Sequence, residues 1–147
     1  MKVVLDTSAL ISAIRSGTGA AAEIVRLVAL GKLTLLLDFK LVCEYHDVAL
    51  RPQHVFASGR KVDDIETAIA MLEAVATPVL VAIKPRPLSQ DADDDMVLDV
   101  AINGHADVIV TNNVKDFALA AERFGLQVLT PRELLIAFRK GESQHAD

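Results

Sequence analysis

Short apolar runs alternate with longer segments of helical periodicity along the chain, and this alternation limits the possible folds more than any other feature. The apolar runs have the length of buried strands, and the segments between them have the spacing of amphipathic helices. Such an order is typical of a parallel sheet with crossover helices. The chain is therefore predicted to be an α/β protein, a three-layer α/β/α sandwich with a central parallel sheet of about five strands.

The positions of the elements follow from the same pattern. The apolar runs predict strands at residues 2–6, 33–37, 79–83, 107–111 and 126–130. The periodic segments predict helices at residues 7–15, 19–30, 39–50, 61–76, 91–103, 115–124 and 131–140. Pro52 is expected to end the third helix and Pro131 to begin the last. Residues 1–140 are expected to form one domain, followed by a flexible tail at 141–147.

Composition favours an intracellular protein. No apolar stretch approaches the roughly 18–20 residues that cross a bilayer, and Asp6 interrupts the segment where a signal peptide would be apolar. Cys43 is the single cysteine, so no internal disulfide can form, and a cytoplasmic location is expected. The net charge of -5 argues against a bulk electrostatic nucleic-acid binder, unless cations are bound to the acidic residues.

Polar residues follow the predicted strands at one edge of the sheet. Asp6 ends the first strand, Asp38 follows the second, and residues 111–113 (Thr-Asn-Asn) follow the fourth. Ligands of open parallel sheets bind in the crevice beyond the carboxyl ends of the strands. Taken alone, Asp6 could equally be a helix cap with Thr7 and Ser8 as polar companions.

A glutamate lies on an otherwise apolar helix face. Leu41, Glu44, Tyr45 and Val48 are spaced i, i+3, i+4 and i+7, so they share one side of the helix. An unpaired charge on such a face is costly when buried. Glu44 is therefore either a functional carboxylate at the rim of the core or a side chain whose head reaches water.

Five aspartates lie in D-A-D-D-D-M-V-L-D. Asp91, Asp93 and Asp94 fit an N-cap and favourable charges in the first turn of a helix. Asp95 and Asp99 lie further in, where capping cannot explain them, and like charges at i, i+4 repel unless a cation is near. Asp95 is the preferred candidate because it is closer to the helix start and the strand ends. An EF-hand loop is excluded, since its sixth position lacks glycine.

Oxygen donors dominate the remaining candidates. Thr111, Asn113 and Asp116 offer ligands or hydrogen bonds at the same sheet edge, although ordinary turn chemistry also favours these residue types. Hard oxygen donors without a Cys/His cluster favour Mg²⁺, with Mn²⁺ possible. Carboxylates around such ions suit phosphodiester hydrolysis, in which the metal activates a water and stabilises the leaving oxygen.

Taken together, these motifs resemble the PIN-domain family, and more narrowly the VapC-like toxin ribonucleases of bacterial toxin–antitoxin systems. The resemblance covers almost the whole chain, through V-V-L-D-T-S-A-L-I-S-A, E-Y-H-D-V-A-L, D-D-D-M-V-L-D-V-A-I-N-G-H-A-D and V-I-V-T-N-N-V-K-D-F. It implies a metal-dependent endoribonuclease that leaves 5′-phosphate and 3′-hydroxyl ends. It also implies a homodimer and a small cognate antitoxin protein as partner.

The resemblance also implies site residues. Asp6, Glu44 and Asp95 match the three core acids, and Thr111 matches the hydroxyl residue. The fourth acidic position often lies two residues after that threonine, where this chain has an amide. The expected catalytic residues are Asp6, Glu44, Asp95 and Asp116; the expected metal ligands are Asp6, Glu44, Asp95, Asp99 and Asn113; the expected substrate-positioning residues are Thr7, Ser8 and Thr111.

Two other interpretations remain open. One is a PIN-fold interaction module without catalytic activity. The other is a nucleotide-binding α/β domain, since Gly17, Gly19 and Ala22 form G-x-G-x-x-A; however, that loop should follow the first strand directly. The histidines are too scattered to predict a zinc site: His46, His54, His105 and His145. Several cations could contact RNA phosphates: Arg15, Lys40, Arg51, Arg60, Lys84, Arg86 and Lys115.

Overall fold

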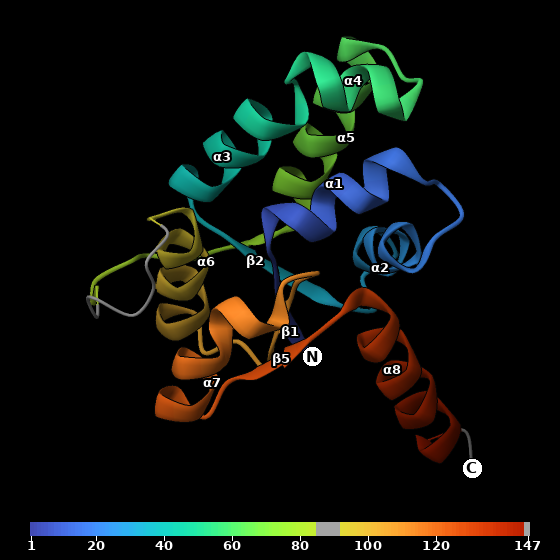
Figure 1. Ribbon diagram of the computed structural model, residues 1–147. Helices are drawn as coiled ribbons and strands as arrows, with labels where there is room; N and C mark the ends of the chain where they lie inside the picture. The colour runs from blue at the N-terminus through green and yellow to red at the C-terminus, as the bar shows by residue number, and fades with distance from the viewer. Residues whose placement is uncertain (85–91, 146–147) are drawn as a thin grey trace.

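A single five-stranded parallel sheet forms the centre of the molecule. The computed structural model describes residues 1–84 and 92–145, and Figure 1 shows the sheet with helices on both of its faces. The strand order is β3 (Thr77–Pro78), β2 (Thr34–Leu37), β1 (Lys2–Leu5), β4 (Val108–Val110) and β5 (Gln127–Leu129), and all four pairings are parallel. The predicted α/β/α sandwich is confirmed.

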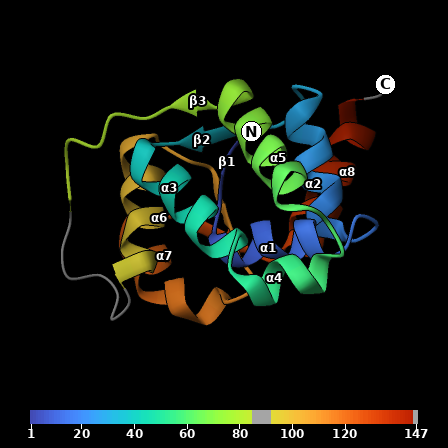
Figure 2. The same cartoon turned by 90° about the horizontal axis from the view of Figure 1, so that it is seen from above.

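The connecting helices divide between the two faces. The first three strands are linked by α1 (Thr7–Arg15), α2 (Ala20–Ala29), α3 (Phe39–Ala49), α4 (Pro52–Ser58) and α5 (Val62–Val75). Later connections use α6 (Ala92–Asn103), the 3₁₀ turn η1 (Val114–Phe117), α7 (Ala118–Phe124) and α8 (Pro131–His145). Because parallel crossovers are right-handed, the helices that link β1, β2 and β3 cover one face, and α6 and α7 cover the other (Figures 1 and 2).

The central strands are buried on both faces. Val3, Val4 and Leu5 of β1 are all buried, as is usual where helices cover a parallel sheet on both sides. Tyr45 of α3 is fully buried, and its hydroxyl donates a hydrogen bond of 2.5 Å to the carbonyl of Leu5. Burial, and then the charge of Asp6, raises the pKa of Tyr45 well above its ordinary value. The protonated tyrosine therefore ties α3 to the carboxyl end of β1.

Three predicted elements differ from the structure. The third strand is predicted at 79–83, but β3 is Thr77–Pro78, and the backbone N–H groups of Ala82 and Ile83 bind the side-chain oxygen of Asn103 instead of a strand. Pro52 follows the end of α3, but it also begins α4, which the sequence pattern does not predict. The last helix is predicted to end at residue 140 and continues to His145.

The glycine-rich segment lies between two helices. Gly17 and Gly19 separate α1 from α2, and Gly19 is the N-cap of α2. The glycines therefore do not follow β1, where a dinucleotide-binding loop would lie. The nucleotide-binding interpretation is not supported by this placement.

Gly104, directly after α6, is required for close packing. A Cβ atom there would lie 2.8 Å from Leu36 Cδ1 and 2.9 Å from Val79 Cγ2. Gly104→Ala is therefore expected to lower the free energy of unfolding by about 1–3 kcal/mol, through overpacking. Gly141→Ala in α8 is the matched control, since nothing lies within 4 Å of its added Cβ, and it should raise stability by about 0.5–1 kcal/mol. Urea denaturation of both variants measures the difference; equal stability of the two would contradict the packing assignment.

Candidate active site

An open cleft of ≈ 430 Å³ lies at the carboxyl ends of the strands, where the strand order reverses between β1 and β4. Ligands of doubly wound sheets bind at such a switch point. Asp6 directly follows β1, and Thr111 directly follows β4. The expected convergence of these two residues is confirmed, since Thr111 Oγ1 donates a hydrogen bond of 2.6 Å to Asp6 Oδ2.

Asp6 is buried and held by two hydroxyl groups. Its Oδ2 accepts hydrogen bonds from Thr111 Oγ1 and, at 2.8 Å, from Ser8 Oγ. Asp6 is the N-cap residue of α1, yet its side chain makes no capping hydrogen bond. The carboxylate is therefore oriented by hydroxyl donors beside a helix N-terminus, whose dipole favours negative charge. The other oxygen, Oδ1, is the one that can face a ligand.

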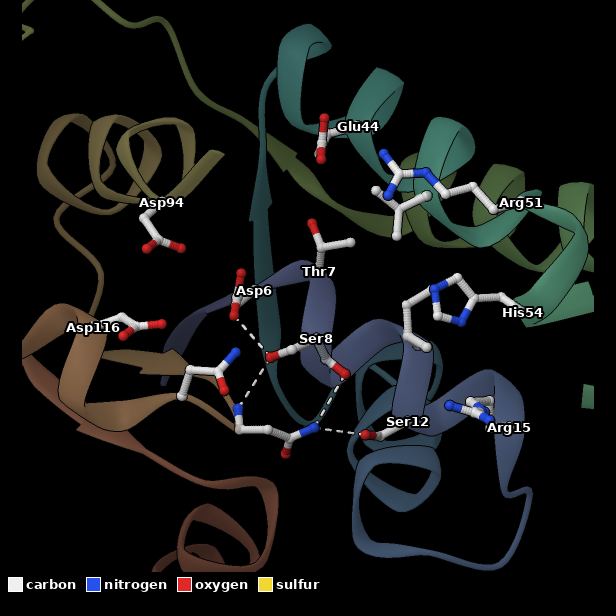
Figure 3. Close-up of a pocket in the computed structure, with 14 residues that line it drawn as sticks. Asp6, Thr7, Ser8, Ser12, Arg15, Glu44, Arg51, His54, Asp94 and Asp116 are labelled. Carbon is white, nitrogen blue, oxygen red and sulfur yellow. Dashed lines mark hydrogen bonds between the residues drawn. The ribbon is translucent and has the colours of Figure 1, made fainter. Parts of the chain in front are cut away.

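The loop after β4 is fastened to α1 around this carboxylate. The backbone N–H of Asn113 donates to Thr111 Oγ1 at 2.9 Å, and that of Asn112 donates to Ser8 Oγ at 3.1 Å. The side-chain Nδ2 of Asn112 also donates to Ser12 Oγ at 2.6 Å (Figure 3). Both hydroxyls that bind Asp6 are thus themselves held by backbone donors, which fixes the direction of the Asp6 carboxylate.

Three further carboxylates line the same cleft. Glu44 comes from α3, Asp94 from α6 and Asp116 from η1, and Figure 3 shows them around Asp6. Glu44 is half-buried, as expected for a glutamate at the rim of an apolar helix face. Asp116, proposed from the sequence to assist the site, is exposed and lines the cleft.

The predicted residues of α6 are placed differently from the other carboxylates. Asp95 and Asp99 are buried and do not line the cleft; the preceding residue, Asp94, lines it instead. Consecutive residues of an α-helix point about 100° apart, so a shift of one position changes the face. Asp91 lies outside the described residues, as does the side chain of Asp93.

The other expected site residues fall into two groups. Three of them, Thr7, Ser8 and Asn113, line the cleft. Thr111 is fully buried and contributes through its hydrogen bond to Asp6. Ser12 and Asn112 also line the cleft, although the sequence motifs assign no role to them. The position of Asn112 could have been predicted from the sequence, because it lies between Thr111 and Asn113, which are both expected site residues.

Comparison with known proteins identifies the fold family. Residues 2–115 match the PIN domain family. The chain belongs to this family. No curated protein matches the sequence. A solved structure, VapBC2 from Rickettsia felis bound to a DNA fragment from their promoter, is similar at 16% identity with a TM-score of 0.56, over 88% of this chain and 97% of that chain.

The donor set of this PIN domain fits a divalent cation of the magnesium type. Four carboxylates and the amide of Asn113 line one cleft, and all offer the oxygen ligands that Mg²⁺ prefers. Among residues 1–84 and 92–145, no three His, Cys, Asp or Glu side chains are grouped closely enough to hold a metal ion by themselves. Mg²⁺ usually binds through one or two carboxylates and keeps several waters, so the wider spacing in the cleft is compatible with it.

Two arginines and a histidine complete the lining of the PIN-domain cleft. Arg15 lies in the last turn of α1, Arg51 precedes α4, and His54 lies in α4. Figure 3 shows the three side chains on the side opposite Asp94 and Asp116. Both arginines are among the cations that the sequence offers as phosphate contacts, whereas the scattered histidines give no such indication. Arg86, another of those cations, lies outside the described residues.

The hydroxyl of Thr111 is expected to control the site through Asp6. Thr111→Val keeps the shape of the buried side chain but removes the 2.6 Å hydrogen bond to Asp6 Oδ2. Loss of an orienting partner behind a metal-binding carboxylate typically costs 10–100-fold in metal affinity or activity. We expect a decrease of roughly that size in metal-dependent activity, measured as kcat/KM against metal concentration. Ser58→Ala is the control, since Ser58 bonds only within the α4 region; an equal effect of both substitutions would contradict the assignment.

Proposed function

We propose that the protein is a metal-dependent endoribonuclease that hydrolyses RNA phosphodiester bonds. The observation that carries this proposal is the meeting of Asp6, Glu44, Asp94 and Asp116 in one open cleft at the switch point of the sheet. A bound Mg²⁺ or Mn²⁺ would supply an activated water and stabilise charge that develops on the scissile phosphate. Membership of the PIN domain family supports nuclease chemistry in this cleft.

The chain's own residues supply orientation and charge. Asp6, held by Ser8 and Thr111, would be the fixed ligand of such an ion, and Glu44 and Asp94 line the same cleft from α3 and α6. Asp116, with Asn113, adds donors from the β4 side. Groups that are preorganised around developing charge are usually the largest source of transition-state stabilisation. We expect the products to carry 5′-phosphate and 3′-hydroxyl ends.

The test of this function is RNA cleavage under controlled metal supply. Purified protein should cleave single-stranded RNA with Mg²⁺ or Mn²⁺, lose the activity with excess EDTA, and regain it when the metal is restored. Persistence of cleavage in EDTA would contradict metal dependence. No cleavage with any divalent metal would favour the alternative, a PIN-fold interaction module without activity.

We also propose that the protein is the toxin of a toxin–antitoxin pair, acting in the cytoplasm as a homodimer with a small cognate antitoxin. The support is the similar fold of VapBC2, whose structure was solved with promoter DNA. No helix in the described part of the chain is long and apolar enough to cross a membrane. Expression of the chain alone should arrest growth, and co-expression of the small protein encoded beside it should relieve the arrest. Harmless expression of the wild-type chain alone would count against this role.

A further inference from the structure

The cleft has a second, cationic half, and we propose that it binds the phosphate next to the scissile one in a single strand of RNA. The residues are Arg15, Arg51 and His54. This inference rests on the proposed function for the identity of the strand, but its binding test does not require cleavage. It extends the site from the reacting phosphate to a neighbouring nucleotide.

The charges in the cleft are separated by element. Asp6, Asp94 and Asp116 lie at the ends of β1 and β4 and on the elements beside them, whereas the cationic residues lie at the end of α1 and around the start of α4; Glu44 of α3 lies between the two groups (Figure 3). The net charge of the chain is -5, so the protein as a whole repels a polyanion. Cationic side chains inside the cleft would offset this repulsion locally. One half of the cleft is thus suited to a cation, and the other half to a phosphate.

Arg51 lines the cleft and pairs with an acidic neighbour of α3. Its guanidinium lies 3.1 Å from Asp47 Oδ2 across one turn, and both side chains are exposed. An exposed pair of this kind contributes little to stability, so a phosphate can compete with it; the contact engages one nitrogen, Nη2, which leaves the other N–H donors of the guanidinium for a ligand. Those donors match the oxygens of a phosphate in a charge-assisted, bidentate geometry.

Arg15 and His54 provide the rest of the subsite. Arg15 is exposed in the last turn of α1, so its head is accessible from the cleft. His54 is half-buried, and its Nδ1 is buried with no hydrogen-bond partner among the described residues. The nitrogen that a ligand can reach is therefore Nε2, which can donate to a phosphate oxygen or a sugar hydroxyl.

The size of the cleft favours one strand over a duplex. Its volume of ≈ 430 Å³ is in the range of small-molecule sites, which suits about a nucleotide or two. Proteins that recognise individual RNA nucleotides usually bind single-stranded segments, because the bases of a duplex are paired and stacked and cannot enter a small site. A strand across the cleft would place one phosphate among the carboxylates and the next toward Arg15 and Arg51.

Binding without catalysis provides the first test. Affinity for a fluorescent single-stranded oligoribonucleotide is measured in EDTA over a range of salt concentrations. The double variant Arg15→Gln/Arg51→Gln should bind roughly tenfold or more weakly, and its log–log salt slope should be smaller by about 0.7, because one phosphate is no longer neutralised. His54→Gln should weaken binding with little change of slope. Arg139→Gln on α8 removes an exposed charge away from the cleft and should bind as wild type does.

Substrate length provides the second test. The ratio of kcat/KM between a trinucleotide and a dinucleoside monophosphate reports the contribution of the neighbouring phosphate. This ratio should fall in the double variant and stay at the wild-type value in Arg139→Gln. An unchanged ratio, or equal salt slopes for the double variant and Arg139→Gln, would overturn the subsite. If wild-type protein binds RNA as described but cleaves none, the proposed function fails, and Arg15, Arg51 and His54 remain an RNA phosphate site without a scissile phosphate beside it.

Discussion

Asp6→Asn is expected to lower metal-dependent RNA cleavage by roughly a thousandfold or more, because several kcal/mol of charge stabilisation depend on this carboxylate. The amide oxygen can still accept the two hydroxyl hydrogen bonds from Ser8 and Thr111 that now reach Oδ2. In that orientation, the amide NH₂ takes the place of Oδ1 and turns two N–H donors toward the cleft. A cation ligand is thereby replaced by a group that repels a cation, while the shape of the side chain is kept.

The same variant separates loss of metal binding from loss of folding. Removal of this charge relieves repulsion among the carboxylates but loses the favourable interaction with the N-terminus of α1, so the metal-free variant should remain folded with a thermal stability close to that of the wild type. Saturating Mg²⁺ should stabilise the wild type, by about 2.7 kcal/mol at a hundred times the dissociation constant, and should have little effect on Asp6→Asn. Thermal denaturation with and without metal measures both effects. Wild-type cleavage rates in the variant would show that Asp6 does not take part.

The position of Asp6 could be predicted because it depends on a general property of parallel sheets. Strands of one direction end at one edge, so the residue after β1 and the residue after β4 had to meet there. The side of α3 that carries Glu44 could be predicted for a similar reason, since its spacing from Leu41 and Val48 is a local property of a helix. In both cases, the sequence pattern and the tertiary structure impose the same constraint.

The third strand could not be placed because its end is decided by a distant contact. The apolar run at 79–83 has the composition of a strand, but pairing with β2 stops at Pro78 and the N–H of Val79. Beyond that point, Asn103 binds the backbone of Ala82 and Ile83 through its side chain. A contact across about twenty residues leaves no periodic signal in the run itself.

The cleft-facing side of α6 differs from the prediction although its signal is present in the sequence. The apolar residues Val97, Leu98 and Ala101 are all buried. Asp94 precedes them at i-3, i-4 and i-7, so it extends their stripe by one turn toward the strand ends. Grouping the aspartates by their mutual spacing of four selects Asp95. Grouping an acid with the apolar face beneath it, as for Glu44, selects Asp94.

Adjacent substitutions in α6 therefore give a sharp test of the site. Asp94→Asn should lower RNA cleavage by roughly a hundredfold or more, because the carboxylate on the cleft is removed while the side chain keeps its size. Asp95→Asn removes the same charge from the next residue, whose side chain is buried off the cleft. Its cleavage rate per folded protein should stay close to that of the wild type.

Stability must be measured beside activity for this pair, because Asp95 is buried and its replacement can change the packing of α6. Urea denaturation gives the folded fraction of each variant, and kcat/KM is then compared at equal folded concentration. The Mg²⁺-dependent rise in stability should be reduced in Asp94→Asn and retained in Asp95→Asn, because only the first residue lines the cleft. The reverse result, with Asp95→Asn inactive and Asp94→Asn active, would show that Asp95 is the third functional carboxylate. It would also require α6 to rotate by about one residue, or 100°, when RNA or metal binds.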